Sequence, residues 1–424
     1  MNNTKPLKVL SLFSGIGAFE KALTKLNIDY ELVNFSEIDK FAIKSYCAIH
    51  NVSETKNLGD INNIELKDLN KDIDLLTFGS PCQDFSIAGQ GKGAKWTCTN
   101  CNYSYNPLII NYKKRHNCPN CNSDNIIKTR SSLLVEGLKI INYIRPKYVV
   151  YENVKNLVGK KFINTFNLFI KELEDYGYKV KYKVLNSIDF NIPQNRERVF
   201  VVAIRNDINK DYEFPQKMKR TVSLVDILEE NPKEKYFLKK EKSDSLIKKL
   251  LEDFNIEEIP ICVASRGRNP NNPNLRQIGL ITKQRLEPNK NGITNTLTTV
   301  QKDNYLLIGN TFLYKKYKMF YNNNGYLPTY FNPYVCMEIK EVSPTLLTTC
   351  GTIGCYSSVL ILLANLRIRK FSPKETFRLM GFLDEDFERA TAVNSDTQLY
   401  KQAGNSIVVN VLENIFKNLL TEYL

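Results

Sequence analysis

One cysteine of this chain lies in a loop directly after a predicted buried strand. The apolar run 73–78 has the length and composition of a strand, and the loop after it reads Gly-Ser-Pro-Cys-Gln-Asp-Phe-Ser. Cys82 therefore stands at the carboxyl end of that strand, which is where open α/β sheets bind their ligands. By itself a Pro-Cys pair in a turn is more often a structural thiol than a nucleophile. The rest of the chain decides between these two interpretations.

Three charged residues also stand at the ends of predicted strands. Glu37 ends the second predicted strand and lies twenty residues after Gly17, the separation at which an acidic side chain accepts ribose hydroxyls in dinucleotide sites. A solvated glutamate at a strand end is the alternative. Glu152 follows a later β-rich run, and Arg198 precedes another. Because the chain has only 2 histidines, catalysis must depend on Cys, Glu, Asp and Arg.

Apolar β-rich runs alternate with helical periodicity along the first half of the chain. A strand, a glycine turn at 14–17 and an amphipathic segment at 18–26 open it like a nucleotide-binding βαβ unit, although the full G-x-G-x-x-G fingerprint is absent. Near-continuous apolar strands separated by helical stretches predict a parallel, doubly wound α/β sheet. The predicted strands are 8–13, 30–35, 73–78, 147–151 and 199–204, and the predicted helices include 133–144 and 162–176.

These segments together resemble the DNA (cytosine-5) methyltransferases. The resemblance covers nearly all of that family's ordered sequence blocks, and the blocks occur in the family's order. It implies a Rossmann-like, S-adenosylmethionine-dependent methyltransferase domain with a smaller β-rich target-recognition domain. The matching blocks are Phe13–Gly17, Glu37, Gly59–Ile61, Gly79–Ser86, Glu152–Val154, Gln194–Arg198 and Gln402–Ile407.

The resemblance implies a pocket for S-adenosyl-L-methionine. Phe13 is expected to stack on the adenine and Glu37 to hold the ribose. Asp60 and Ile61 are expected to contact the adenine, although Asp60 could equally cap the turn that follows it. The other residues placed in this pocket are Gly15, Gly17, Ile38, Gly79, Pro81, Leu133 and Asn405.

The expected chemistry explains the residue types at the catalytic position. Carbon 5 of cytosine accepts a methyl group only after a nucleophile adds to carbon 6, and a thiolate suits that covalent step, so Cys82 is the expected nucleophile. Glu152 would protonate or hydrogen-bond N3, which requires a raised pKa, and Arg198 would donate to O2. Asn153 is expected to orient the loop backbone, and Arg196 to pair with Glu152 or with a neighbouring loop. The base that removes the C5 proton cannot be identified.

The target cytosine must leave the duplex to reach a thiol at a sheet edge. In the family the segment after the Pro-Cys pair closes on DNA as a mobile loop, and here Ile87–Gly93 contains three glycines in seven residues, which favours a hinged loop. A plain flexible linker would have the same composition. Gln83 and Ser86 lie between Cys82 and this loop, and they are candidates for DNA contact.

Four cysteines after this loop have the spacing of a zinc ribbon. Cys98 and Cys101 form one C-x-x-C pair, Cys118 and Cys121 form another, and sixteen residues separate the pairs. Coordination of Zn²⁺ by four thiolates would fold a segment that is too small and polar to fold otherwise, and it would leave no open position for catalysis. Reduced free cysteines are the alternative.

The insert that contains these cysteines, about 94–129, mixes basic and aromatic residues. Such a mixture suits phosphate contacts and stacking on bases, so the ribbon is expected to extend the DNA footprint or to couple loop closure to DNA binding. A passive decoration is equally compatible with the sequence. The residues concerned are Lys95, Trp96, Tyr103, Tyr105, Tyr112, Lys113, Lys114, Arg115 and Lys128.

After residue 205 the pattern changes, and from about 261 to 363 the chain is rich in Asn, Thr, Tyr and short β-runs. The resemblance implies a catalytic domain at 1–205, a target-recognition domain with a junction helix at 206–400, and a return to the catalytic domain at 401–424. Thr-Leu pairs at 296–297 and 345–346 both resemble the family's recognition loops. The candidates for reading bases, with phosphate contact or a solvated loop as the alternative, are Arg266, Arg268, Thr296, Leu297, Gln301 and Asn304.

Composition limits the partners. A net charge of +14 and a pI of about 9.1 suit a phosphate-bearing partner, which is expected to be double-stranded DNA. No run is long enough to cross a bilayer and no signal-peptide pattern precedes the first strand, so we expect a cytoplasmic monomer of a bacterial or phage modification system. The sequence leaves open which site is methylated and whether a separate restriction endonuclease exists.

Three other functions compete with this one. Methylation of cytosine in RNA is less well supported, because the long polar recognition segment favours DNA. A catalytically inactive DNA-binding protein would need a broken catalytic set, whereas Cys82, Glu152 and Arg198 are all present. A redox protein built on C-x-x-C is disfavoured, since the cysteine pairs lie in a basic insert rather than at a helix start.

Overall fold

The computed structural model divides into two compact units. One consists of Met1–Thr221 with Thr376–Leu424, and the other of Val222–Glu375. The first unit thus takes in residues 206–221 and 376–400, beyond the boundaries expected from the sequence. The described residues are 5–81, 85, 93–115, 117–253, 261–275, 280–289, 292–298, 304–308 and 367–424. The predicted site residues Cys82, Gln83, Ser86 and Gln301, and the Thr-Leu pair at 345–346, lie outside them.

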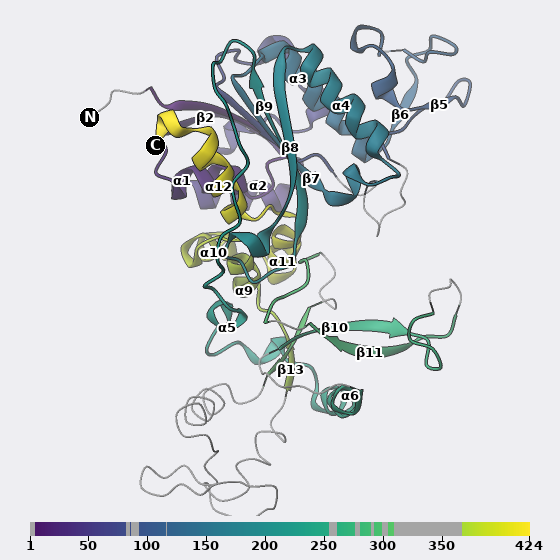
Figure 1. Ribbon diagram of the computed structural model, residues 1–424, viewed down its shortest axis with the longest axis vertical. Coiled ribbons are helices and arrows are strands. Elements are labelled where there is room, and N and C mark those ends of the chain that lie inside the picture. The colour runs from purple at the N-terminus through teal and green to yellow at the C-terminus, as the bar shows by residue number, and fades with distance from the viewer. Residues whose placement is uncertain are drawn as a thin grey trace, which may run out of the picture. The chain divides into compact units, whose positions relative to one another are not determined.

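A 6-stranded sheet forms the centre of the first unit (Figure 1). Its strands lie in the order β2-β1-β3-β7-β9-β8, and β9 runs antiparallel to both of its neighbours while the other pairs are parallel. The strands are β1 Leu7–Leu12, β2 Tyr30–Ser36, β3 Leu75–Phe78, β7 Tyr148–Val154, β8 Tyr178–Asn186 and β9 Glu197–Arg205.

The expectation of a parallel sheet is wrong for β9. A parallel neighbour of β8 would need a crossover of a dozen or more residues, and only the short segment 187–196 joins the two strands. This segment turns back on itself, so β9 enters the sheet in the opposite direction. The strand therefore begins, rather than ends, at the edge where β7 ends.

The edge strand β8 was not among the predicted strands. Lysines alternate with apolar residues along it, at Lys179, Lys181 and Lys183, which hides the continuous apolar run that marks the inner strands. Alternation of this kind is typical of a strand with one face in solvent, and charged side chains on an edge strand also discourage pairing with another chain.

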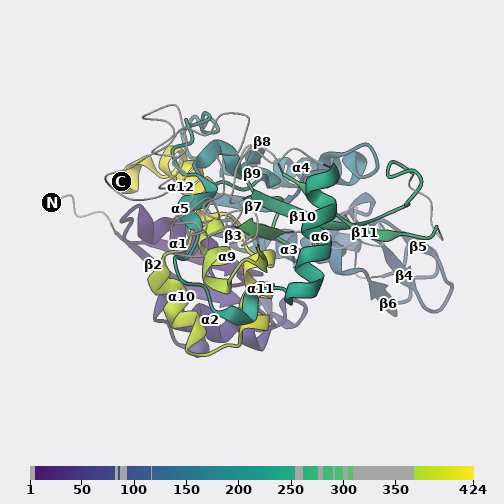
Figure 2. The same cartoon turned by 90° about the horizontal axis from the view of Figure 1, so that it is seen from below.

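Helices cover both faces of this sheet (Figures 1 and 2). On one face, α3 Leu134–Ile144 and α4 Ile163–Asp175 share a buried hydrophobic cluster with side chains of β1, β3, β7 and β9. On the other face, α1 Ala18–Lys25 packs against α12 Val409–Leu419. The rings of Phe19 and Phe416 lie 6.4 Å apart there. The last α-helix of the described chain, α12, thus packs on the first, α1.

Three further helices of the first unit, α2, α10 and α11, pack against one another. Helix α2 packs against α10 and α11, and α11 ends next to the turn at Ser406. Their bounds are α2 Lys40–His50, α10 Asp384–Thr391 and α11 Asp396–Asn405, preceded by α9 Pro373–Leu379.

A small antiparallel sheet lies in the cysteine-containing insert. Its strands have the order β5-β4-β6, with β4 Trp96–Cys98, β5 Ser104–Tyr105 and β6 Ile126–Lys128. Strand β4 pairs with both neighbours, so the entry and the exit of the insert lie side by side.

The second unit contains a four-stranded antiparallel sheet covered by one helix. The order is β11-β10-β12-β13, and Ile247 of the helix packs with Val263, Leu286 and Ile368 in its core. The elements are α5 Leu224–Ile227, α6 Lys240–Asp253, β10 Ile261–Arg268, β11 Lys283–Pro288, β12 Tyr305–Ile308 and β13 Arg367–Lys370.

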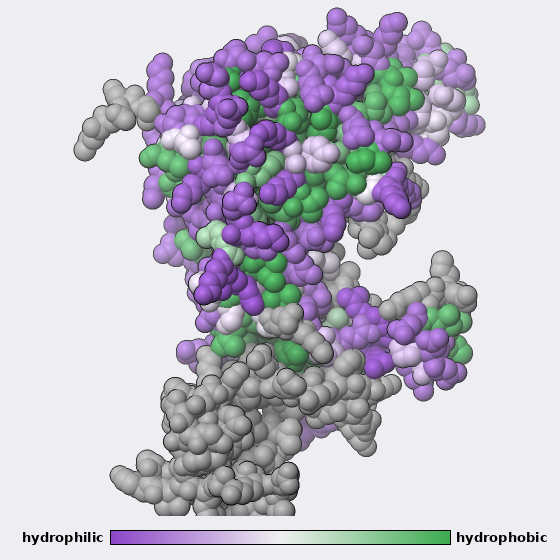
Figure 3. All heavy atoms as spheres, viewed as in Figure 1, coloured by the Kyte–Doolittle hydropathy of each residue, from purple (hydrophilic) through white to green (hydrophobic). Residues whose placement is uncertain are grey.

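Hydrophilic side chains cover most of the first unit in the view of Figure 3, with smaller hydrophobic areas between them. Among the described residues, no helix is both long and apolar enough to cross a membrane.

Candidate functional site

Polar groups of the sheet meet at one edge. Strand β3 ends at Phe78, and Gly79–Pro81 lead from it toward Cys82. In the register of β7 and β9, Val154 pairs with Arg198, so the end of β7 and the beginning of β9 coincide. The antiparallel direction of β9 thereby places Arg198 beside Glu152. Both lie at the edge of the sheet where residues 79–81 lead from β3 toward Cys82 in the sequence.

Glu152 and Arg198 form a partly buried ion pair at this edge. Arg198 Nε lies 3.1 Å from Glu152 Oε1, and their side chains are 17% and 12% exposed. Burial raises the pKa of Glu152, and the charges of Arg198 and Arg196 oppose that rise. A carboxyl group in this environment can carry a proton at a pH where an ordinary glutamate is ionised.

Gly79 lies beside the second oxygen of Glu152. A Cβ at position 79 would be 3.4 Å from Glu152 Oε2, an ordinary van der Waals contact. The second carboxylate oxygen therefore faces the start of the loop that leads to Cys82.

Asn153 anchors the backbone just before the cysteine. Its Nδ2 donates to the Ser80 carbonyl at 3.0 Å and to the Tyr151 hydroxyl at 2.8 Å, and the side chain is fully enclosed. The Ser80 and Tyr151 hydroxyls are 3.1 Å apart. Tyr151 was not predicted from the sequence, where its only signal is a hydroxyl next to Glu152 in an otherwise apolar run.

Arg196 holds the C-terminal turn against the sheet. Its Nη2 donates to the carbonyls of Gly404, at 3.1 Å, and Ser406, at 2.7 Å. These two residues flank the exposed Asn405. The contacts make Arg196 a positioning residue, and of the two expected partners they favour the neighbouring loop, although its charge also acts on Glu152.

The carboxylate of Glu37 organises the loop after β1. Its Oε2 accepts a hydrogen bond from the Gly15 amide at 2.9 Å, and its Oε1 accepts from the amides of Ile38 and Asp39 at 2.8 Å. Three backbone donors fix the carboxylate at the end of β2, so it is not the solvated glutamate of the alternative. Asn57, which accepts from the Glu37 amide at 3.0 Å, supports the same corner.

The two glycines of this loop have different reasons for being glycine. Both have positive φ, 56° at Gly15 and 79° at Gly17. At Gly17 an added Cβ would overlap the His50 ring, whereas at Gly15 it would meet nothing within 4 Å. Open space beside Gly15 fits a bound ligand. Phe13, with φ 52°, is a strained non-glycine residue, which is a common feature of ligand-binding loops.

The expected adenine contacts gather on one side of the sheet. Asp60 Oδ1 accepts from the Asn62 amide at 2.9 Å, so the capping role considered for Asp60 is present. Ile61 is buried in the cluster of α3 and α4, and Phe13 and Leu133 pack against the same cluster. Ile38 is 71% exposed, which leaves its side chain free for contact with a ligand.

The four cysteines of the insert converge. Their Sγ atoms all lie within 4.8 Å of one another, including 3.5 Å from Cys98 to Cys121 and 3.6 Å from Cys101 to Cys118. Tetrahedral Zn²⁺ with Zn–S bonds of about 2.3 Å requires sulfur atoms about 3.8 Å apart. A backbone amide also donates to sulfur, from Asn120 to Cys118 at 3.4 Å, as expected for a thiolate ligand.

The two halves of this cluster repeat one backbone turn. Asn102 and Asn122, each directly after the second cysteine of a pair, have φ of 57° and 58°. Asparagine tolerates this left-handed conformation better than most residues. The repeated turn and the converging sulfur atoms fit a four-thiolate metal centre.

Several insert residues expected to touch DNA are instead part of the core. Trp96 and Tyr105 are 4% and 5% exposed, and Arg115 is 6% exposed. Arg115 donates to both oxygens of Glu172 on α4, at 2.9 and 2.5 Å. Packing of the insert on the catalytic unit explains these residues, so the interpretation of them as a stacking surface is wrong. Tyr103 and Tyr112 remain at the surface.

The candidates for reading bases also include both buried and exposed side chains. Asn304 is 5% exposed and its Oδ1 accepts from the Asn295 amide at 3.0 Å, while its Nδ2 donates to the Thr296 carbonyl at 3.3 Å. These contacts give Asn304 a structural role, and Leu297 is also buried. Arg268 pairs with Glu287 across the sheet, and Arg266, whose side chain is 40% exposed, lies 3.6 Å from the same carboxylate.

Comparison with known proteins agrees with this arrangement. The model of the C-5 cytosine-specific DNA methylase family matches residues 7–113 and 122–421, and the break falls inside the cysteine-containing insert. The orphan methyltransferase M.SPBetaI of Bacillus phage SPbeta is 36% identical over 98% of both chains. The type II methyltransferase M2.ScrFI of Lactococcus lactis subsp. cremoris is 32% identical over 97% of this chain and 99% of its own.

Solved structures share the fold at lower identity. The Entamoeba histolytica methyltransferase EhMeth has a TM-score of 0.58 at 19% identity, and the Dnmt2 methyltransferase of S. pombe has 0.56 at 19%, each aligned over 99% of both chains. The family match spans both units, and the Glu152–Arg198 pair lies within it. The chain therefore belongs to the C-5 cytosine-specific DNA methylases, enzymes that transfer a methyl group to carbon 5 of cytosine in DNA.

Proposed function

We propose that the enzyme methylates a cytosine flipped out of duplex DNA, through a covalent adduct with Cys82. The observation that carries the proposal is the partly buried Glu152–Arg198 pair, whose carboxyl group has a raised pKa and stands at the sheet edge where residues 79–81 lead to Cys82. Two donors, the protonated carboxyl group of Glu152 and the guanidinium group of Arg198, can there face the ring edge that carries N3 and O2.

The Cys82 thiolate adds to carbon 6, and the electron pair of the 5,6 double bond moves toward N3 and O2, where protonated Glu152 and Arg198 stabilise it. Carbon 5 then takes the methyl group of S-adenosylmethionine, which leaves as S-adenosylhomocysteine. Loss of the C5 proton to a base and expulsion of the thiolate restore the double bond.

The residues around the glycine loop fit S-adenosylmethionine. Three backbone amides hold the carboxylate of Glu37, and one of them is the amide of Gly15, beside which there is open space. In the proposal Phe13, Ile61 and Leu133 enclose the adenine, and Asn405 closes the pocket from the C-terminal turn that Arg196 holds. The bound cofactor would supply the methyl group and no other chemistry.

The insert is proposed to bind one structural Zn²⁺ through Cys98, Cys101, Cys118 and Cys121. The spacing of the sulfur atoms supports tetrahedral coordination by all four thiolates, which leaves no position for substrate. We further propose that the enzyme acts as a cytoplasmic monomer of a bacterial or phage modification system. Relatives include both orphan and type II enzymes, so both an orphan role and a role beside a separate cognate restriction endonuclease have precedents in the family.

Bisulfite sequencing tests the proposed function. Unmethylated plasmid DNA is incubated with the enzyme and S-adenosylmethionine, converted and sequenced, which also reveals the recognition site. Wild-type protein should protect a defined set of cytosines, and Cys82→Ser should protect none while binding the cofactor normally. Protected cytosines in the Cys82→Ser reaction would refute the nucleophile, and none with wild type would refute the activity. Parallel incubation with tRNA tests whether RNA is a substrate instead.

A further inference from the structure

Hydrogen bonds connect the cysteine-containing insert to the residues directly before α3, where a cofactor contact is proposed. The Trp96 ring nitrogen donates to Ser132 Oγ at 2.9 Å, and Ser132 is 1% exposed. Ser132 Oγ in turn donates to the Thr129 carbonyl at 2.7 Å. Leu133, proposed to touch the adenine, is the next residue, and α3 begins directly after it.

The entry and the exit of the insert, residues 93–96 and 128–132, form its stem, and Thr129 joins the two. Its amide donates to the Lys95 carbonyl and its Oγ1 accepts from the Lys95 amide, both at 3.0 Å. Its hydroxyl also donates to the Gly93 carbonyl at 2.9 Å. One side chain therefore ties the entry of the insert, its exit and the residue that follows the 82–92 segment.

The metal ligands extend the same two strands. Cys98 is the last residue of β4, which starts at Trp96, and it pairs with Ile126 at the start of β6. Cys118 and Cys121 precede β6 by a few residues. Coordination would thus fix the register of β4 against β6, and this register determines where Trp96 and Thr129 lie.

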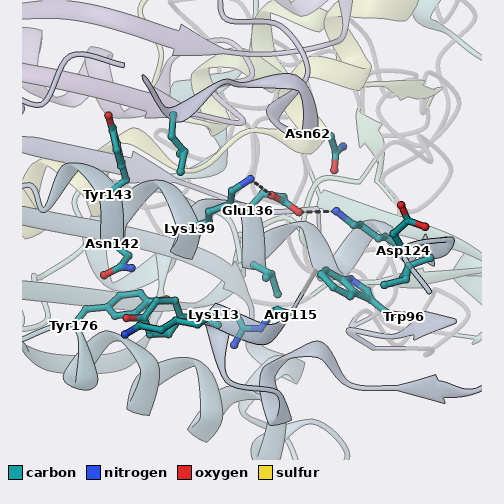
Figure 4. A pocket seen from close by; sticks show the side chains of 15 residues that line it. Asn62, Trp96, Lys113, Arg115, Asp124, Glu136, Lys139, Asn142, Tyr143 and Tyr176 are labelled. Carbon is teal, nitrogen blue, oxygen red and sulfur yellow. Dashed lines mark hydrogen bonds and ion pairs between the residues drawn. The ribbon is translucent and has the colours of Figure 1, made fainter. Parts of the chain in front are cut away.

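The body of the insert is clamped to the catalytic unit at a second place. The Arg115–Glu172 pair joins it to α4, and Tyr176 also donates to Glu172 at 2.5 Å. Between this clamp and the stem lies a cavity of about 710 Å³ (Figure 4). Across it, Lys128 of β6 reaches Glu136 of α3 at 2.8 Å. The side chains of Trp96 and Lys128 thus connect the insert to Ser132 and Glu136, directly before and within the first turn of α3.

We propose that the metal-loaded insert positions the start of α3 for cofactor binding, with Thr129 and Trp96 as positioning residues. The inference rests on the proposed function for the identity of the cofactor and on the proposed four-thiolate zinc site. It adds to the expectation that the ribbon extends the DNA footprint or couples loop closure to DNA binding, because buried contacts also hold the insert on the catalytic unit.

The experiment measures S-adenosylmethionine affinity by calorimetry in full-length variants. Thr129→Val removes the hydroxyl without changing the shape, and it should weaken cofactor binding about tenfold, the value of one to two lost hydrogen bonds. Thr129→Ser should restore it. Thr97→Val is the matched control and should leave affinity unchanged, because Thr97 Oγ1 bonds to the Ser104 hydroxyl inside the insert, at 2.8 Å, and to no other side chain in the described part of the chain. At saturating cofactor, kcat should change less than about twofold.

Metal removal supplies the second arm. Chelation, with release of one zinc per chain verified by elemental analysis, should weaken binding in wild type and have a smaller effect in Thr129→Val, since both act through the stem. Normal affinity in folded Thr129→Val, or in the zinc-free protein, would overturn the inference. Binding is read without methylation, so wild-type protein that binds the cofactor but protects no cytosine would instead refute the proposed function.

Discussion

Two arginine–glutamate pairs of the first unit have the same chemistry and different surroundings. Where the insert packs on α4, both carboxylate oxygens of Glu172 accept hydrogen bonds, because Arg115 donates to each of them and Tyr176 donates as well. At the sheet edge, Arg198 contacts one oxygen of Glu152, while the other faces Gly79. A fully satisfied pair serves packing. A pair with acceptor capacity to spare, beside a residue without a side chain, is suited to chemistry.

The strongest way to break this distinction is to remove each carboxyl group in turn. Glu152→Gln should lower the single-turnover rate of methylation about 10²- to 10⁴-fold, the usual value of a general acid. Glu172→Gln, the matched change at the packing pair, should leave the rate per folded molecule nearly unchanged. Rapid quench with labelled cofactor measures both rates, and equal losses would contradict the division of roles.

The free energy of unfolding should depend more on the Arg115–Glu172 pair than on the Glu152–Arg198 pair. Arg115→Met leaves Glu172 buried without its main partner, which costs about 3–5 kcal/mol. The double variant Arg115→Met with Glu172→Leu should recover much of that loss, because an apolar pair of similar volume leaves no unpaired charge. Urea unfolding followed by circular dichroism gives the free energies. A double variant no more stable than the single one would show that the pair itself, rather than the unpaired charge, matters.

The pH dependence sharpens the comparison further. Burial raises the pKa of Glu152, so its stabilising contribution is complete below the ordinary glutamate pKa and is lost as pH rises through the higher folded value. The methylation rate should fall over the same range, because the protonated form is the donor to N3. In Glu152→Gln the alkaline limb should disappear, together with most of the activity, and the protein should gain stability at neutral pH. An unchanged limb would assign it to another group.

A smaller effect is expected at His50, under the glycine loop. Burial lowers the pKa of this ring to about 4, although Nε2 donates to the Ile16 carbonyl at 3.0 Å. The sign is opposite to that of Glu152, since stability is complete above the ordinary histidine value and is lost as pH falls from about 6.5 to about 4. The loss is on the order of 1 kcal/mol per pH unit. Thermal unfolding of wild type and His50→Gln across this window tests it, and parallel curves would contradict it.

The strand-edge site could be predicted from the sequence because each block follows a recognisable apolar strand. The position of Glu152 and Arg198 depends only on where two such strands end and begin, and that information is local. The direction of β9 could not be predicted in the same way. It follows from the short 187–196 connection, and the connection could not be recognised while β8 remained hidden by its alternating lysines.

The roles of residues in the insert and the recognition segment depend on contacts that are remote in sequence. Arg115 and Glu172 are 57 residues apart in the sequence, and no residue pattern near Arg115 predicts that partner. Composition alone therefore suggested a nucleic-acid surface where the structure has a packed interface. Asn304 was misjudged for a similar reason, because an amide that closes a loop and an amide that reads adenine are the same residue type.

Trapping the covalent intermediate tests the central claim most directly. Duplex DNA containing 5-fluorocytosine at the recognition site, once mapped, is incubated with enzyme and S-adenosylmethionine, because fluorine at carbon 5 cannot leave as a proton and the adduct cannot resolve. We predict a complex stable to denaturant, with the methylated base attached to Cys82 by peptide mass spectrometry, and no such complex for Cys82→Ser. An adduct on another residue, or methylation of ordinary cytosine without any trapped complex, would contradict the account.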